Sequence, residues 1–230
     1  MNPKISELLE RIHQIREEIE QEVGRRRAFL LAALLALLAA CSAEKAVPLP
    51  PGTTALTLGD SLTAGYGLGP EQAWPALLAG KTGWRIVNGG VSGDKTSDAL
   101  ARLPALLDAH APRLVLVALG GNDMLRRLPE EQTRANLARI LELVRARNAQ
   151  PVLLATPRPS VAGVVFQRLS PPDFYAELAR ERKVPLVEDA IAETLSDPGL
   201  KLDQLHPNAA GHEALAGKLF DALRKLGYVR

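Results

Sequence analysis

Short apolar runs alternate with longer segments of helical spacing from about residue 53 to the C-terminus. The apolar runs predict five strands: Ala55–Leu58, Arg85–Val87, Leu114–Leu119, Val152–Thr156 and Pro185–Val187. The segments of helical spacing predict five helices: Gln72–Gly80, Ser97–Ala109, Glu130–Arg147, Pro172–Glu181 and Asn208–Leu226. This alternation is typical of an α/β protein with three α/β/α layers, and we expect a flavodoxin-like, five-stranded parallel sheet with helices on both faces.

Two groups of large apolar residues are assigned to the core. Within Glu130–Arg147, Arg134 and the apolar residues Leu137, Ile140, Leu141 and Val144 recur at the spacing of one helix face, which favours burial against the sheet. Trp74 and Trp84 are likewise expected to pack in the core rather than to contact a substrate.

The N-terminal part of the chain has a different pattern. Arg25-Arg26-Arg27 precede an unbroken apolar run from Ala28 to Ala40, which is short for a membrane-spanning helix and has the charged-then-apolar order of a signal peptide. Leu38-Ala39-Ala40-Cys41 resembles a bacterial lipobox, which implies cleavage before Cys41 and lipid attachment to its sulfur. Cys41 is the only cysteine and lies at this boundary, whereas a buried free thiol would require a cysteine inside the folded domain.

These features divide the chain into four parts. Residues 1–24 are an N-terminal extension, 25–41 a lipoprotein-type signal peptide, 42–52 a proline-rich tether, and 53–230 one folded domain. In the extension, apolar residues at heptad positions are compatible with a short coiled coil, and a translation start near Val23 explains the segment equally well. The expected location is outside the cytoplasm, in the periplasm or on the cell surface, with a lipid anchor in the membrane.

Charge and composition exclude several functions. Lys and Arg total 28 against 26 for Asp and Glu, and a net charge of +2 offers no general attraction for nucleic acid. No His and Cys residues have the spacing of metal ligands, so we expect neither a metal nor another cofactor. Arg126 and Arg127 have two interpretations, contact with an anionic head group or a solvated loop face, and the second is favoured.

The candidate chemistry lies in two short segments. Gly59-Asp60-Ser61-Leu62 places a serine where the first predicted strand breaks into a loop, and Asp203-Gln204-Leu205-His206 places an acid three residues before an imidazole. Serine becomes a strong nucleophile when a base takes its proton, and the base works best when a third group fixes its tautomer. Ser61, His206 and Asp203 have these three chemistries. Taken alone, Asp203 is better explained as a residue that caps a turn.

The other three histidines fit this role less well. His13 lies in the N-terminal extension, and His110 ends a predicted helix, where a cation is favourable near the last carbonyls. His212 begins the last predicted helix and has no acid at the corresponding offset. His206 is therefore the expected base.

Acyl transfer also needs donors for the developing oxyanion, each worth roughly 3 kcal/mol of barrier. The second and third predicted strands lead into Asn88–Asp94 and Gly120–Asp123, and each segment contains one candidate donor. The backbone N–H of Gly93 and the side-chain amide of Asn122 are expected to join the N–H of Ser61. The carboxyl ends of parallel strands lie along one edge of an open sheet, where ligands bind.

These segments resemble the SGNH hydrolases, also called the GDSL esterase/lipase family, from about Thr54 to Tyr228. The resemblance rests on Gly59–Gly67, Ser92-Gly93-Asp94, Gly120–Asp123 and Asp203–Asn208. It implies that Ser61 is the nucleophile of a Ser-His-Asp triad and that Ser61, Gly93 and Asn122 form the oxyanion hole. Ala73–Leu78 and Ala101–Leu107 resemble the thioesterase/lysophospholipase/arylesterase branch, whereas Thr156–Pro172 shows no family pattern.

The expected function is therefore that of a serine ester hydrolase that acts on small-molecule or lipid esters through an acyl-enzyme. The Gly-x-Ser-x-Gly elbow of the α/β-hydrolases is absent, which argues against that fold. Three alternatives remain. They are an acyl-CoA thioesterase, an acyltransferase or deacetylase acting on cell-envelope glycans, and a binding lipoprotein that has lost its activity.

Overall fold

The computed structural model describes residues 11, 13–14, 16–17, 20–27, 46–159 and 168–230, and the chain divides into two units, Met1–Lys45 and Ala46–Arg230. In the first unit, residues 20–27 are helical. The apolar run Ala28–Ala40 and Cys41 lie outside the described residues, as do the five apolar heptad residues of the extension, Ile5, Leu8, Ile12, Ile15 and Ile19. Among the residues that are described, no helix has both the length and the apolar character needed to cross a membrane.

The second unit is built on a five-stranded sheet whose order is β2-β1-β3-β4-β5. All neighbouring strands are parallel, which confirms the predicted flavodoxin-like sheet. The strands are β1 (Thr54–Gly59), β2 (Arg85–Gly90), β3 (Leu114–Ala118), β4 (Gln150–Leu154) and β5 (Leu186–Val187). Each overlaps a predicted strand, and their ends differ by a few residues.

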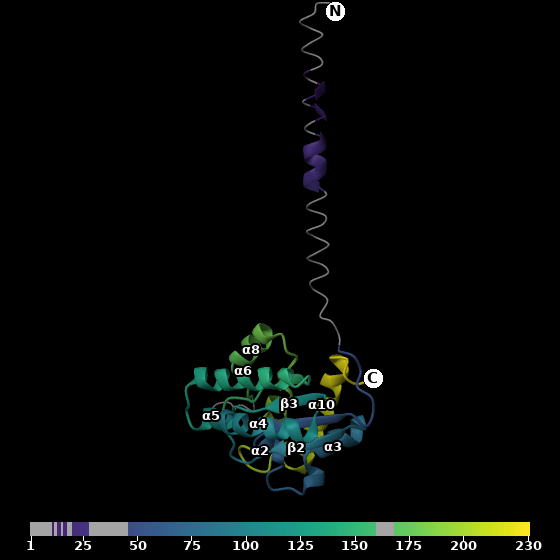
Figure 1. Cartoon of the computed structure of the whole chain (residues 1–230). Coiled ribbons are helices and arrows are strands. Elements are labelled where there is room, and N and C mark those ends of the chain that lie inside the picture. The colour runs from purple at the N-terminus through teal and green to yellow at the C-terminus, as the bar shows by residue number, and fades with distance from the viewer. Residues whose placement is uncertain (1–10, 12, 15, 18–19, 28–45, 160–167) are drawn as a thin grey trace, which may run out of the picture. The chain divides into compact units, whose positions relative to one another are not determined.

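Helices cover both faces of the sheet (Figure 1). One face carries α4 (Thr96–His110), α6 (Glu130–Ala146) and α8 (Phe174–Arg182). The other carries α3 (Trp74–Thr82), α9 (Ala190–Ser196) and α10 (Ala209–Lys225). The remaining elements are the short helices α2 (Ser61–Ala64) and α5 (Gly121–Leu125) and the 3₁₀ helices η1 (Pro70–Gln72) and η2 (Pro198–Leu200).

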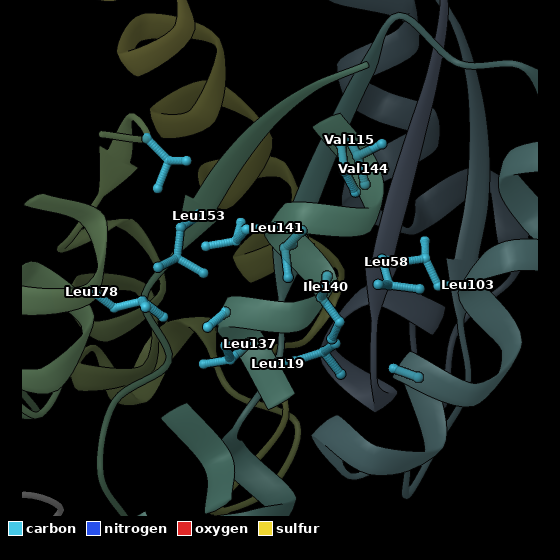
Figure 2. Packing of buried hydrophobic residues seen from close by; sticks show 14 of the residues in the cluster. Leu58, Leu103, Val115, Leu119, Leu137, Ile140, Leu141, Val144, Leu153 and Leu178 are labelled. Atoms are coloured by element: carbon cyan, nitrogen blue, oxygen red, sulfur yellow. The ribbon is translucent and has the colours of Figure 1, made fainter. Parts of the chain in front are cut away.

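The two faces have separate apolar cores because successive strand residues point to opposite sides of the sheet. Leu56 and Leu58 of β1 pack with α4, α6 and α8, whereas Ala55 packs with α3, α9 and α10. Figure 2 shows the first core, in which Leu103 of α4 and Ile140 of α6 lie close to β1 and β3. The apolar residues predicted to be buried are buried: Leu137, Ile140, Leu141 and Val144 in the first core, Trp74 and Trp84 in the second. The prediction is wrong for Arg134, which is only partly buried because its guanidinium pairs with Glu177 and Glu181 of α8.

Helices α2, α5 and α9 were not predicted, and the first of them corrects the expectation for Ser61. The serine is the first residue of a one-turn helix rather than part of a loop. Asp60 caps this helix by accepting a hydrogen bond from the Leu62 N–H, and Gly65 ends it in the left-handed conformation with φ 81°. A helix of one turn is too short to produce a periodic pattern of apolar residues.

The first residues of the second unit are hydrogen-bonded to the last residues of the same unit. The N–H of Ala46 donates to the carbonyl of Leu226 at 3.0 Å, and the N–H of Leu49 donates to Tyr228 at 2.9 Å. The indole N–H of Trp84 also donates to the carbonyl of Leu49. The described part of the predicted tether therefore packs against the folded domain.

Candidate active site

The candidate residues lie at the carboxyl ends of β1, β2 and β3, where successive connections run to opposite sides of β1. Strand β1 has β2 on one side and β3 on the other, so the connections that leave these three strands are neighbours at their carboxyl ends. Ser61 follows β1, Gly93 follows β2, and Asn122 lies in α5 directly after β3. Open α/β sheets bind ligands at such a switch point.

A continuous chain of contacts links the serine, the imidazole and the carboxylate. The Oγ of Ser61 lies 3.0 Å from Nε2 of His206, although the two residues are 145 positions apart in the sequence. Nδ1 of His206 lies 2.8 Å from Oδ2 of Asp203 and 3.0 Å from Oδ1. A proton on Nδ1 leaves Nε2 as the acceptor for the serine hydroxyl, which is the tautomer that a general base requires.

Asp203 is prepared as an anion by a tight turn of the backbone. Its Oδ1 accepts hydrogen bonds from the N–H groups of Leu205 at 2.7 Å and His206 at 2.8 Å. Partial burial opposes ionisation of this carboxyl, but the hydrogen bonds from the His206 ring and the two backbone N–H groups outweigh it and lower its pKa. The predicted turn-capping role and the predicted contact with the imidazole are therefore both present in one residue.

The His206 ring is held from several sides. The carbonyl of His206 accepts a hydrogen bond from the Leu202 N–H at 2.9 Å, and Lys201 pairs with Pro207 in an antiparallel bridge that closes the loop. The Tyr66 ring lies against the imidazole with a centroid separation of 4.5 Å and a tilt of 33°. The backbone contacts close the loop that carries His206, whereas Tyr66 and Asp203 contact the imidazole ring itself.

Two backbone N–H groups beside the serine have no acceptor within the described part of the chain. They belong to Ser61 and Gly93, and both residues line the same cavity. Gly93 has φ 85°, a conformation that residues with a side chain rarely adopt, so glycine is what allows its amide to take this orientation. Preorganised donors of this kind suit a negatively charged oxygen.

The Asn122 amide is held by two acceptors. Its Nδ2 donates to the carbonyl of Asp94 at 3.0 Å and to Oδ2 of Asp60 at 3.2 Å. Asp94 is itself fixed by Arg102, whose Nε lies 2.7 Å from Oδ2 of Asp94 and whose Nη2 donates to the carbonyl of Gly59. The three connections that leave β1, β2 and β3 are thus joined in one polar network.

Asp60 is the least expected member of this network, because it is a carboxylate with only 2% of its surface exposed. Burial disfavours the charged form and raises the pKa of Asp60 to about 6, although the Leu62 N–H, the His206 ring and the Asn122 amide act in the opposite direction. Sequence reasoning did not single out Asp60. Its position directly before Ser61 was visible, but its contact with Asn122 across 62 positions was not.

His212 has a structural role that the sequence did not indicate. Its ring is buried, and its Nδ1 accepts a hydrogen bond from the backbone N–H of Trp74 at 3.1 Å, at the start of α3. Burial, and then the nearby His206 ring, lower the pKa of His212 to about 4. A neutral His212 therefore caps α3, whose preceding residue Ala73 provides no side-chain acceptor.

A cavity of about 1000 Å³ opens above the serine and is lined mainly by apolar surface. Its wall includes Leu62, Tyr66, Leu125, Pro157, Leu169 and Leu205. Within the described residues, no three His, Cys, Asp or Glu side chains gather as a metal site would require. The cavity is therefore polar at Ser61, Asn122 and His206 and apolar along its walls, and it is large enough for an acyl group.

A serine, an imidazole and a carboxylate in hydrogen-bond contact form the arrangement of a serine hydrolase. Comparison with known proteins agrees with this class. The sequence profile of the GDSL-like Lipase/Acylhydrolase family matches residues 57–214. The protein therefore belongs to this family.

Individual relatives narrow the class to ester hydrolases. The chain is 41% identical over 178 residues to "Thioesterase 1/protease 1/lysophospholipase L1" of Escherichia coli K12, covering 75% of this chain and 84% of the relative. It is 37% identical over 158 residues to an "Arylesterase" of Vibrio mimicus, covering 66% and 78%. The crystal structure of TesA superposes with a TM-score of 0.68 at 34% identity, covering 76% of this chain and 99% of that one. The protein is a hydrolase that acts on ester bonds.

Proposed function

We propose that Ser61 is the nucleophile, His206 the general base and acid, and Asp203 the residue that orients His206. The contact of 3.0 Å between Ser61 Oγ and His206 Nε2 is the observation that carries this proposal. These residues come from opposite ends of the domain sequence, so their approach has no local cause. Ser92 lines the same cavity but has no hydrogen bond to a base among the described residues.

The first half of the reaction forms an acyl-enzyme. Ser61 Oγ attacks the ester carbonyl carbon while its proton passes to Nε2 of His206, and the carbonyl π electrons become the charge of the oxyanion. When the tetrahedral intermediate collapses, the carbon–oxygen bond to the alcohol breaks and that alcohol leaves with the proton from Nε2. Asp203 stabilises the imidazolium throughout without accepting its proton.

The second half releases the acid. Water replaces the alcohol, gives one proton to Nε2 as its oxygen attacks the acyl carbon, and forms a second tetrahedral intermediate. The bond to Ser61 Oγ then breaks, and the proton on Nε2 returns to the serine. The N–H groups of Ser61 and Gly93 are the proposed donors to the oxyanion in both halves, and the Asn122 amide joins them by turning one of its two N–H bonds from Asp60 or the Asp94 carbonyl to the oxyanion.

The substrate is a carboxylic ester whose acyl or alcohol portion is apolar, because the cavity walls are mostly apolar. A thioester is the second candidate substrate, and the name of the Escherichia coli relative, which includes both a thioesterase and a lysophospholipase, favours it. The same triad serves both bonds, because in each case the nucleophile attacks a carbonyl carbon and the oxyanion has the same position.

The proposed location is the cell envelope, with a lipid on Cys41. The arginine triplet, the apolar run and Leu38-Ala39-Ala40-Cys41 support this proposal, and they also support the division into residues 1–24, 25–41, 42–52 and 53–230. Cys41→Ser should prevent both lipid attachment and cleavage, so the protein should remain in its unlipidated, full-length form. A mature protein that lacks a lipid-modified N-terminal cysteine by mass spectrometry would contradict the anchor.

The catalytic proposal is tested with a water-soluble p-nitrophenyl butyrate. Ser61→Ala and His206→Ala should each lower kcat by about four to six orders of magnitude, because removal of either member disables the whole unit. Ser92→Ala is the matched control, since it removes another cavity-lining hydroxyl, and it should keep its rate. Circular dichroism and Tm establish that the variants are folded. Normal turnover by folded Ser61→Ala would refute the assignment.

A further inference from the structure

Exposed apolar side chains occur in the same segments as residues that line the cavity. Among the described residues of Ala46–Arg230, the large hydrophobic residues that remain exposed include Val47, close to the start of this unit. The other exposed ones all belong to connections at the carboxyl edge of the sheet, and we call them the apolar rim: Tyr66, Val91, Leu125, Leu202 and Leu205. Between 41% and 51% of the surface of each is exposed.

The rim is assembled from four separate connections. Tyr66 follows α2 and lies against the His206 ring, and Val91 directly precedes the Ser92-Gly93 pair that lines the cavity. Leu125 ends α5, three residues after Asn122. Leu202 and Leu205 lie in the loop that holds Asp203 and His206, where a Leu202 methyl group approaches Gly67. Every rim residue therefore either lines the cavity or directly adjoins a residue that lines it.

Two rim residues are exposed for a reason that neither packing within the domain nor contact with a single substrate explains. Tyr66, Leu125 and Leu205 line the cavity and would touch a bound acyl chain. Val91 and Leu202 do not line it, and they remain 44% and 49% exposed. Exposed apolar groups that gather in one place mark interaction surfaces. Here Val91 and Leu202 form the part of the rim outside the cavity, and Tyr66, Leu125 and Leu205 form the part that lines it.

The charges at the rim favour an anionic partner. Arg126 follows Leu125 and donates to the carbonyl of Gly93 at 3.3 Å, which places its guanidinium at the cavity mouth. Arg127 is also exposed, and neither arginine pairs with a carboxylate within the described residues. Of the nearby carboxylates, Asp94 pairs with Arg102, whereas Asp203 stays an anion that accepts a hydrogen bond from the neutral His206 ring. Arg126 and Arg127 are therefore the exposed cations next to Leu125 of the rim, where they can contact phosphate groups.

We propose that the apolar rim docks on the surface of an anionic phospholipid membrane, so that an ester passes from the lipid layer into the cavity. Apolar side chains next to arginines match a surface that is hydrocarbon below and phosphate at the level of the head groups. Such a surface engages side chains from four connections at once. This inference concerns how substrate reaches the site, and its link to catalysis rests on the proposed function.

Docking is tested first without using catalysis. In the full chain carrying Cys41→Ser, an environment-sensitive fluorophore is attached at Leu202→Cys in the rim or, as control, at Ala101→Cys on the exposed side of α4. Vesicles of phosphatidylcholine with phosphatidylglycerol should shift the Leu202 label to shorter wavelength and leave the Ala101 label unchanged. Arg126 and Arg127 should each make binding to these anionic vesicles about fivefold tighter than binding to vesicles of phosphatidylcholine alone. Equal responses of the two labels, or no response of the Leu202 label, would overturn the proposal.

The same experiment in a Ser61→Ala background should give the same fluorescence, because docking does not need the nucleophile. A failure of the catalytic proposal and a failure of the rim proposal are therefore distinguishable.

The second test separates docking from chemistry. Val91→Ser combined with Leu202→Ser changes only side chains that lie outside the cavity and keeps the backbone N–H of residue 202 that donates to the carbonyl of His206. Hydrolysis of soluble p-nitrophenyl acetate should therefore stay within about twofold of the unsubstituted chain. Hydrolysis of p-nitrophenyl palmitate carried in anionic vesicles should fall about tenfold or more, because two apolar side chains no longer enter the lipid. Val47→Ser is the matched control and should change neither rate.

Two outcomes would overturn the proposal. One is an equal loss on both substrates, which would place Val91 and Leu202 in the chemistry or the fold. The other is a change from dimer to monomer on sedimentation of the double variant, which would assign the rim to contact with a second copy of the chain.

Discussion

Asp60 is a buried carboxylate beneath the nucleophile, and replacement by asparagine tests whether the domain is destabilised by its ionisation. Burial raises the pKa of Asp60 from its ordinary 3.8 to about 6. Since one pKa unit corresponds to about 1.4 kcal/mol, this difference corresponds to about 3 kcal/mol of stability. The native state binds the proton more tightly than the unfolded chain. The extra stability is therefore fully present below about pH 4 and is lost as the pH rises through about 6.

Asparagine has a similar shape but cannot ionise, so Asp60→Asn should not show this loss. The free energy of unfolding, measured by urea denaturation from about pH 4 to about pH 8, should rise in the variant relative to the unsubstituted chain by about 3 kcal/mol across that range. The difference between the two curves isolates Asp60, because His212 and the other titrating groups are present in both proteins. A constant offset from altered hydrogen bonds does not affect this change with pH.

The variant should also lose activity. With Oδ1 of residue 60 still accepting from the Leu62 N–H, an amide nitrogen would face Nδ2 of Asn122, and two donors cannot bond to each other. We expect kcat to fall about tenfold or more while the fold is kept, because one oxyanion donor loses its support. Glu188→Gln, which removes an exposed carboxylate, is the control for both measurements. A difference curve that is flat with pH would refute the account of Asp60.

Two further predictions concern Asn122 and His212. Asn122→Ala should lower kcat by about a hundredfold to a thousandfold with little change in KM for p-nitrophenyl butyrate, and an unchanged kcat would remove Asn122 from the oxyanion hole. His212→Leu should lower the free energy of unfolding at neutral pH by about 1–3 kcal/mol, because the Trp74 N–H loses its acceptor. The stability given by neutral His212 is present above pH 6.5 and lost as the pH falls through about 4, so urea denaturation should show the deficit shrinking on acidification.

The sequence predicted the sheet because buried parallel strands are apolar on both faces. Leu114–Ala118 is buried throughout, and its run of Leu and Val was readable without any tertiary information. The meeting of Ser61, Gly93 and Asn122 at one edge followed from the same alternation, since consecutive parallel strands bring their carboxyl ends together. The offset between Asp203 and His206 is local and fits within one turn of the backbone.

What escaped prediction depends on contacts between distant residues. The bonds from Asn122 to Asp60 and to the Asp94 carbonyl join three connections, and no spacing in the sequence encodes them. The bond from Trp74 to His212 spans 138 positions. Helices α2 and α5 are each little more than one turn, so they depend on caps and on neighbouring strands rather than on periodicity.

The sequence indicated the exposed arginines next to the rim but not the rim itself. Arg126 and Arg127 were assigned to a solvated loop face, and both are exposed. The contact of Arg126 with the carbonyl of Gly93 depends on two connections that are far apart in the chain. The sequence alone identified the two arginines, but it did not identify the exposed apolar residues of the rim.

The central claim is that Ser61 is activated by His206, and covalent labelling tests it most directly. A fluorophosphonate should modify the folded chain on Ser61, with the adduct located by mass spectrometry of the peptide that contains it, and His206→Ala should abolish this labelling under the same conditions. An adduct on Ser92 or another serine, or no adduct on a chain that still hydrolyses p-nitrophenyl butyrate, would contradict the account.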